Sequence, residues 1–205
     1  MIIYDFEQRS EAWHQIRLGK FTASSFASVM ASDSTAAYQN IIAQVAGEII
    51  TREIEESYSS DAMQRGIELE SEARHLYESI FGNVREVGFC EPDEDDPLYG
   101  WVGISPDGLI DTGETEFKCP LIKTHLEYIK RNELPNTYKW QVQGQLMITG
   151  LEYCDFMSYY PKMKPFIIRV FPDLEMHKKL TDKLLVSIEK VNEILKNYNE
   201  YDFLK

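Results

Sequence analysis

The spacing of apolar residues changes at Gly82-Asn83, and this change limits the folds that the chain can adopt. Before it, apolar residues recur at helical spacing, which predicts helices over 9–18, 35–53 and about 60–81, with a further helix start at 22–25. After it, short alternating segments bounded by Gly and Pro predict strands over 84–91, 99–104, 107–112, 114–119, 151–160 and 165–171. Further helices are predicted near 122–132, 136–149 and 173–197.

This order of elements favours an α/β (α+β) fold, with a central mixed β-sheet flanked by helices and a helical N-terminal region. The 205 residues and their 43% hydrophobic content suit one domain with a substantial core. We expect a single domain over 1–205, in which residues 1–82 are mainly helical, residues 83–171 form a sheet-containing core and residues 172–205 form a C-terminal helix. The strands over 99–104, 107–112 and 114–119 are expected to form an antiparallel unit.

The net charge of −13 argues against nucleic-acid binding when the chain is taken as a whole. The charge is unevenly spread, however: residues 1–102 carry 7 basic and 19 acidic side chains, whereas 118–169 carry eight basic and four acidic. A local basic surface on an acidic body is therefore possible, because binding depends on the local field. Its candidate residues are Lys123, Lys130, Arg131, Lys162 and Lys164. The acidic run over 91–97 is interpreted as a solvated loop.

Composition also excludes several classes of protein. No apolar run approaches the roughly 20 residues of a membrane helix, and residues 1–5 lack a basic region followed by an apolar signal core. We therefore expect a soluble, cytoplasmic protein without membrane contact. The three cysteines, Cys90, Cys119 and Cys154, have no close Cys or His neighbours of the kind that zinc sites show. They are interpreted as reduced thiols in or near strands.

The candidate chemistry lies in Ser105-Pro106-Asp107-Gly108-Leu109 and Glu114-Thr115-Glu116-Phe117-Lys118. Residues i and i+2 of a strand share a face, so Glu116 and Lys118 point the same way and Phe117 points into the core. If 107–112 pairs with 114–119, Asp107 lies beside Glu116. Two close carboxylates favour a cation between them, and Mg²⁺ prefers such oxygen ligands. A surface salt bridge on an edge strand would explain an isolated Glu-x-Lys equally well.

Two further features strengthen the site. Glu70 and Arg74 share a face of the helix before the sheet, and Glu70 would complete a metal site if it pointed toward the sheet edge. The alternative is a solvent-facing Glu70 paired with Arg74; Glu68 and Glu72 are expected to face solvent. Downstream, the residues Tyr138, Gln141 and Gln145 share a helical face. Amides there suit binding of phosphate oxygens or water, although ordinary packing explains that face too. With a lysine to orient water, the set suits phosphodiester hydrolysis.

These segments together resemble the phage lambda-type exonucleases, a viral recombinase nuclease family of the restriction-endonuclease-like PD-(D/E)xK superfamily. The segments that carry the resemblance are Trp13-His14-Gln15-Ile16-Arg17-Leu18-Gly19 with Thr22-Ala23-Ser24, Gly66-Ile67-Glu68-Leu69-Glu70 with Ala73-Arg74, Ser105-Pro106-Asp107-Gly108-Leu109, Glu116-Phe117-Lys118-Cys119-Pro120, Gln141-Val142-Gln143 and Tyr160-Pro161-Lys162-Met163-Lys164. They come in the family's order and cover roughly residues 11–165.

The resemblance implies a restriction-endonuclease-like core and a Mg²⁺-dependent 5′-to-3′ exonuclease on linear double-stranded DNA, with Mn²⁺ as a possible substitute. It implies release of 5′-mononucleotides, a 3′ single-stranded tail for recombination, a ring-shaped homotrimer and a single-strand annealing protein as partner. By position, Asp107, Glu116 and the Phe117 backbone carbonyl correspond to metal ligands, and Lys118 to the catalytic lysine. Glu70 corresponds to the helix carboxylate near the metal. The residues that correspond to a 5′-phosphate pocket are Arg17, Ser24, Ser105 and Gln141.

Three alternatives stay open at this point. A nuclease related to the iron–sulfur proteins of CRISPR adaptation would need four cluster cysteines, and the chain has three. A non-catalytic acidic protein that mimics DNA would suit the net charge but does not need Lys118 among carboxylates. A nuclease of the same superfamily with a different polarity is the third alternative.

Overall fold

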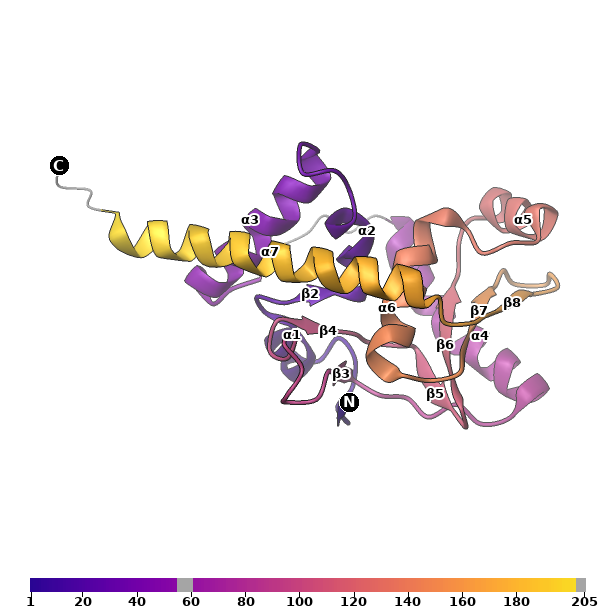
Figure 1. Ribbon diagram of the computed structural model, residues 1–205. Helices are drawn as coiled ribbons and strands as arrows, with labels where there is room; N and C mark the ends of the chain where they lie inside the picture. Colours follow the sequence, from indigo (N-terminus) through magenta and orange to yellow (C-terminus); the bar gives the residue numbers. More distant parts are fainter. Residues whose placement is uncertain (55–60, 202–205) are drawn as a thin grey trace.

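The computed structural model describes residues 1–54 and 61–201 (Figure 1). Its helices are α1 Glu11–Arg17, α2 Phe26–Val29, α3 Ala36–Thr51, α4 Asp61–Phe81, α5 Ile122–Arg131, α6 Asn136–Thr149 and α7 Leu174–Glu200, with a 3₁₀ turn at Ala23–Ser25. Its strands are β1 Ile2–Tyr4, β2 Phe21–Thr22, β3 Phe89–Glu91, β4 Val102–Gly103, β5 Gly108–Ile110, β6 Gly113–Lys118, β7 Tyr153–Ser158 and β8 Phe166–Val170. The predicted helix start near residue 60 lies outside the described residues.

The main sheet has four strands in the order β5-β6-β7-β8. The central pair β6 and β7 is parallel, and both outer pairs are antiparallel. The chain crosses from β6 to β7 through α5 and α6, because parallel neighbours need a long connection. The predicted mixed sheet flanked by helices, and the helical N-terminal region, are therefore confirmed (Figure 1).

One predicted pairing is wrong. The strand expected over 99–104 is reduced to β4, which pairs in parallel with β2 instead of joining β5 and β6. Residues 96–101 instead make turns, with the Tyr99 amide donating to the Asp96 carbonyl. Gly103 passes directly against the Phe89 ring, which fills the space that a β-carbon would need. This packing places β4 against β3, and Ile104, the next residue, bridges to Cys90.

The strand predicted over 84–91 is also shorter than expected. Only Phe89–Glu91 forms β3, which pairs with β1, while Arg85 makes an isolated bridge to Leu109. The two-stranded sheets use β1 and β2, which hydrophobic alternation did not reveal because they are only three and two residues long. In the acidic loop, Asp93 to Asp96 are exposed, as expected, whereas Glu91 is buried in β3 beside Lys20 and Tyr4.

Helices cover both faces of the four-stranded sheet, and this arrangement sets the direction of each side chain on β6. On one face, Tyr77 of α4 packs with Phe117 and Met157. On the other face, Leu146 of α6 packs with Phe156. Because faces alternate along a strand, Glu116 and Lys118 point toward α6, opposite to Phe117. The expected inward direction of Phe117 is confirmed by its 4% exposure.

A polar network fixes α4 to the sheet. The Tyr77 hydroxyl donates to Asp155 Oδ2 at 2.7 Å, and Arg169 donates to both oxygens of the same carboxylate at 2.9 and 2.8 Å. Asp155 is only 2% exposed, so these donors compensate the loss of its hydration. No helix among residues 1–54 and 61–201 combines the length and apolar character needed to cross a membrane.

Candidate active site

Glu116 lies at the centre of the site and is almost completely buried, with 1% exposure. Gln141 Nε2 donates to its Oε1 at 2.6 Å, and Gln145 Nε2 donates to its Oε2 at 2.7 Å. Lys118 forms an ion pair with the same Oε1. Both amides come from α6, where a spacing of four residues places them on one face above β6. Three donors therefore hold the carboxylate in one orientation.

Asp107 lies just before β5, opposite β6. Its Oδ2 accepts a hydrogen bond from the Phe117 amide at 2.5 Å, and its own amide donates to the Thr115 carbonyl at 3.1 Å. Burial raises the pKa of Asp107 well above its usual range, and the negative charge of Glu116 raises it further. The structure thus brings the two carboxylates together, with an excess of negative charge that a cation would offset.

Lys118 is the cation closest to this charge. Its side chain is 27% exposed, and its ammonium lies 5.2 Å from the centre of the Tyr138 ring. Burial lowers the pKa of Lys118, but the carboxylates of Glu116 and Asp107 outweigh it and raise the pKa above its ordinary value. The lysine therefore remains protonated at neutral pH in this arrangement, paired with Glu116.

The donor set fits a magnesium ion. Asp107 and Glu116 provide carboxylate oxygens, which Mg²⁺ prefers. The Lys118 carbonyl accepts from Tyr159 on the β7 side, so the neighbouring Phe117 amide and carbonyl face the β5 side, where Asp107 lies. Among the described residues, however, no three His, Cys, Asp or Glu side chains lie close enough to form a metal site by themselves.

Glu70 is the helix carboxylate of the predicted set. Arg9 donates to its Oε2 at 2.5 Å, and Arg74 lies 3.8 Å from its Oε1. Its charge also contributes to the raised pKa of Asp107, so it belongs to the same electrostatic environment. Glu70 is therefore paired with Arg9 and Arg74, and its charge acts on Asp107 without a direct contact to it among the described residues, while Glu68 and Glu72 are exposed as expected.

A second cluster gathers around Ser105, two residues before Asp107. Arg17 Nη1 and Trp13 Nε1 both donate to Ser105 Oγ, at 3.2 and 2.9 Å. The guanidinium lies over the Trp13 ring, 3.9 Å from its centre. Burial lowers the pKa of Arg17 to about 10, which leaves it charged at neutral pH. The geometry presents a rigid cation with hydroxyl neighbours, an arrangement suited to phosphate.

The remaining predicted phosphate residues lie on either side of this cluster. Arg17 Nη2 donates to Thr22 Oγ1 at 3.4 Å, and Thr22 Oγ1 lies 3.3 Å from Ser24 Oγ. Ser24 is exposed and lines a cleft of about 690 Å³ together with Arg17. Gln141 is held at Glu116 instead. The structure thus joins Arg17 directly to Ser105, connects it to Ser24 through Thr22, and leaves Gln141 on the carboxylate side.

Sequence reasoning missed some residues of this region. Thr22 links Arg17 to Ser24, yet it was given no role in the site. Gln145 was expected to bind phosphate or water, whereas it donates to Glu116. Trp13 shares a face with Arg17 at a spacing of four, which is the signal that could have paired them. Glu48 is a buried carboxylate on α3 that lines the same cleft as Arg17. The sequence pattern did not single out Glu48, because the apolar spacing of α3 indicates only a helix packed on the core.

The predicted basic residues are exposed at one end of the main sheet. Lys123, Lys130 and Arg131 lie on α5, and Lys162 and Lys164 lie in the β7–β8 turn. His125 connects the two, since its ring nitrogens lie 2.8 Å from Ser158 Oγ and 3.1 Å from the Lys164 carbonyl. Within the described portion of the chain, none of the five basic residues forms an ion pair.

The cysteines agree with the prediction of reduced thiols. Cys90 and Cys154 are buried in β3 and β7, Cys119 follows β6, and all three are free. Burial raises the pKa of the Cys90 and Cys119 thiols to about 12. They are therefore protonated and unreactive at neutral pH.

Comparison with solved structures shows a close relationship to exonucleases. The chain is 35% identical to the alkaline exonuclease LHK-Exo from Laribacter hongkongensis, with a TM-score of 0.84 over 93% of this chain and 96% of that chain. LHK-Exo in complex with dAMP matches with the same identity and TM-score, over 92% and 96%. A phage-related exonuclease from Haemophilus somnus 129PT shares the fold at 15% identity, with a TM-score of 0.67 over 87% and 96%.

The family comparison agrees with the structural one. No curated protein matches the chain. The sequence model of the YqaJ-like viral recombinase domain matches residues 12–152, which include Arg17, Glu70, Asp107, Glu116 and Lys118. This protein therefore belongs to the YqaJ-like viral recombinase family and is a DNA nuclease of the lambda-exonuclease type.

Proposed function

We propose that this protein is a Mg²⁺-dependent exonuclease that degrades one strand of linear double-stranded DNA from its 5′ end. The observation that carries the proposal is the connection through Ser105. Its hydroxyl binds Arg17 and Trp13, while Asp107, two residues later, lies at the carboxylate pair. A phosphate held at Arg17 would therefore be followed along the strand by a phosphate at Asp107 and Glu116.

Asp107, Glu116 and the Phe117 carbonyl would hold the metal, with Glu70 as the nearby helix carboxylate and Mn²⁺ as a substitute. A bound Mg²⁺ would polarise the scissile phosphate and lower the pKa of a water molecule. Gln141 and Gln145 keep Glu116 oriented, so little reorganisation is needed when substrate arrives. Lys118 orients the attacking water and offsets negative charge on the phosphate.

Arg17, Ser24 and Ser105 would bind the terminal 5′-phosphate, with Gln141 reaching the phosphate from the carboxylate side. Arginine suits this role because its planar fork donates two hydrogen bonds to one phosphate. The exposed basic residues of α5 and the β7–β8 turn would contact the duplex backbone. These contacts carry no sequence information, so we expect little sequence preference.

The products would be 5′-mononucleotides and a 3′ single-stranded tail. The complex of LHK-Exo with dAMP supports this proposal, because dAMP is a deoxynucleoside monophosphate. The viral recombinase family supports a role in recombination by strand annealing, with a single-strand annealing protein as partner. By resemblance to the lambda-type enzymes we propose a ring-shaped homotrimer acting in the cytoplasm, and light scattering at micromolar concentration would measure the mass of the assembly.

The proposal is tested by nucleotide release from a 5′-phosphorylated linear duplex. We expect acid-soluble mononucleotides with Mg²⁺, none with EDTA, and none from a covalently closed circle of the same sequence. A non-catalytic DNA mimic would release nothing from either substrate, and its net charge of −13 would then be the relevant property. Equal release from linear and circular DNA would contradict exonuclease action and favour an endonuclease.

A further inference from the structure

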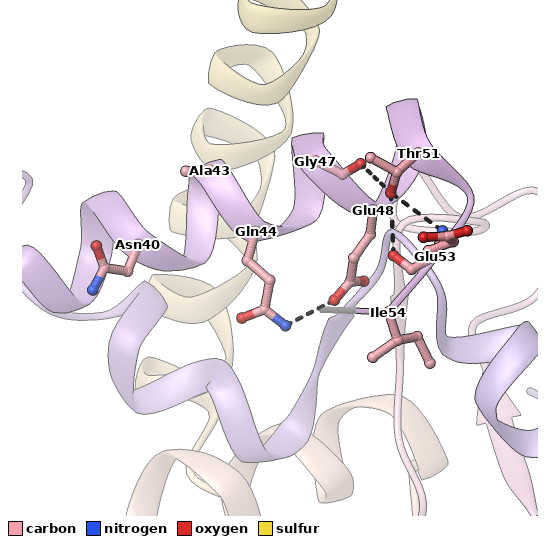
Figure 2. A pocket seen from close by; sticks show the side chains of 8 residues that line it. All are labelled: Asn40, Ala43, Gln44, Gly47, Glu48, Thr51, Glu53 and Ile54. Atoms are coloured by element: carbon pink, nitrogen blue, oxygen red, sulfur yellow. Dashed lines mark hydrogen bonds between the residues drawn. The ribbon is translucent and has the colours of Figure 1, made fainter. Parts of the chain in front are cut away.

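The cleft beside Arg17 extends well beyond the space that one phosphate needs. The hollow lined by Arg17, Ser24 and Glu48 measures about 690 Å³. A second hollow of about 690 Å³ adjoins it, and the two share Asn40, Gln44, Glu48 and Ile54. Figure 2 shows the side chains that line this second hollow. Neither is lined by Asp107, Glu116 or Lys118 among the described residues, so the cleft leads from Arg17 away from the carboxylate pair.

The charge of the lining changes sign along this cleft. At the first hollow the basic side chains are Arg17 and Lys20, and Lys20 is already paired with Glu91 at 3.1 Å. At the second hollow the described lining contains two carboxylates, Glu48 and Glu53, and no lysine or arginine. A polyanionic chain that passed Arg17 would therefore meet negative charge next.

Glu48 is held rigidly at the point where the charge changes. It is 6% exposed; its Oε2 accepts the Gly19 amide at 2.9 Å and its Oε1 accepts Gln44 Nε2 at 2.8 Å. Figure 2 shows Gln44 and Glu48 directed to the same side of α3. Gly19 has a φ of +69°, and a β-carbon there would lie 2.5 Å from Ile49 Cγ1. The turn after α1 is therefore packed closely on α3.

This packing fixes Glu48 relative to Arg17, which ends α1 two residues before Gly19. Among the described residues Glu48 forms no ion pair with a basic side chain, so its carboxylate does not bind the guanidinium of Arg17. Arg17 donates only to the hydroxyls of Ser105 and Thr22, and no carboxylate pairs with it among the described residues. Glu48 accepts two neutral donors, and its charge acts on Arg17, whose pKa it raises against the effect of burial. Its negative charge therefore reaches the region of the cleft beyond Arg17.

We propose that Glu48 is a specificity-determining residue that restricts the cleft to a terminus carrying a single phosphate. The space beyond Arg17 is large enough for further phosphates, so exclusion by size is insufficient. The fixed carboxylate instead repels a second or third phosphate group attached to the 5′ end. This inference rests on the proposed 5′-end-directed activity and adds to it a preference for monophosphate over polyphosphate ends.

The test compares two blunt duplexes of one sequence, one with a 5′-monophosphate and one with a 5′-triphosphate, each blocked at its other end. The readout is the ratio of kcat/KM for the triphosphate end to that for the monophosphate end. We expect a ratio well below one for the wild type. Glu48→Gln, which keeps the size and the hydrogen-bond acceptor, should raise it about four- to fifteenfold at low salt. This is the effect of the Glu48 charge on one added phosphate charge at an assumed separation of about 10 Å and an effective dielectric constant of about 20 to 40, and the second added phosphate increases it further.

Two further variants make the test specific. Glu189→Gln removes the same charge from an exposed site on α7 and should leave the ratio unchanged. Asn40→Asp adds a carboxylate at an exposed position that lines both hollows, and should lower the ratio. This variant preserves the hydrogen bonds of Glu48, so it tests the idea even if Glu48→Gln folds poorly.

Two results would overturn the inference: equal use of both ends by the wild type, or a ratio that Glu48→Gln and Asn40→Asp do not change. Failure of the proposed function looks different. In that case the wild type would not prefer a 5′-monophosphate to a 5′-hydroxyl end, or would not release nucleotides at all. Failure of the inference alone would leave the monophosphate preference intact.

Discussion

Gln145→Leu is expected to separate activity from stability. Gln145 is completely buried, and its Nε2 supplies one of the three donors to Glu116. A hydrogen bond to a charged group contributes about 1.5–3 kcal/mol, so its loss should reduce kcat/KM about 10- to 150-fold if Glu116 is used in the transition state. The opposing effect on stability arises from Gln145 Oε1, which is buried and has no hydrogen-bond partner among the residues that the structure describes.

Leucine removes that unpartnered oxygen, whose burial costs about 1–3 kcal/mol. The lost hydrogen bond and the removed penalty offset each other, so the free energy of unfolding should change by no more than about 2 kcal/mol. Nucleotide release with a Mg²⁺ titration measures the first effect, and denaturant unfolding followed by circular dichroism measures the second.

Gln143→Leu is the matched control on the same helix. Gln143 is 5% exposed and forms hydrogen bonds with the Phe171 carbonyl, the Asp173 amide and His177. None of these hydrogen bonds involves Glu116. Its replacement should cost about 2–4 kcal/mol of stability and leave activity per folded molecule unchanged. Wild-type activity in Gln145→Leu, or a loss of activity explained entirely by unfolding, would refute the role of the amide in orienting Glu116.

Three further substitutions test other features of the account. Lys118→Ala should abolish hydrolysis while DNA binding, measured by fluorescence anisotropy, stays largely intact; retained turnover would remove Lys118 from the mechanism. Arg17→Ala should lower kcat/KM on 5′-phosphorylated ends about 10- to 100-fold, to the level of 5′-hydroxyl ends, since a charge-assisted phosphate contact is lost; an equal loss on both ends would argue against a phosphate pocket. Arg169→Met should cost about 1–3 kcal/mol of stability, because Asp155 keeps only Tyr77 while the arginine is 44% exposed; unchanged denaturant stability would show that the network is not stabilising.

Local sequence spacing was sufficient to predict that Asp107, Glu116 and Lys118 lie together. Glu116 and Lys118 share a face because they are two residues apart on β6, and the short Gly113 connection brings Asp107 beside them. The same logic placed Gln141 and Gln145 on one face of α6. Which residues share a face depends only on the period of a helix or strand, so it does not change with the way the elements pack.

Contacts between distant segments could not be predicted in this way. The pairing of β2 with β4 joins Phe21 to Val102, and no local pattern identifies either partner. The hydrogen bond from Trp13 to Ser105 and that from Gly19 to Glu48 likewise depend on how α1 and α3 pack. The error over 99–104 has the same origin, because burial against Phe89 rather than alternation decides where β4 lies.

The central claim, degradation from a 5′-phosphate, is tested most directly by following each strand of one duplex separately. One strand carries a 5′-phosphate, the other a 5′-hydroxyl, and each has a distinct fluorophore at its 3′ end. With Mg²⁺, we predict that the 5′-phosphorylated strand becomes progressively shorter while keeping its 3′ label, and that the other strand remains full-length. Early release of the 3′ label as a mononucleotide, or equal loss of both strands, would contradict the account.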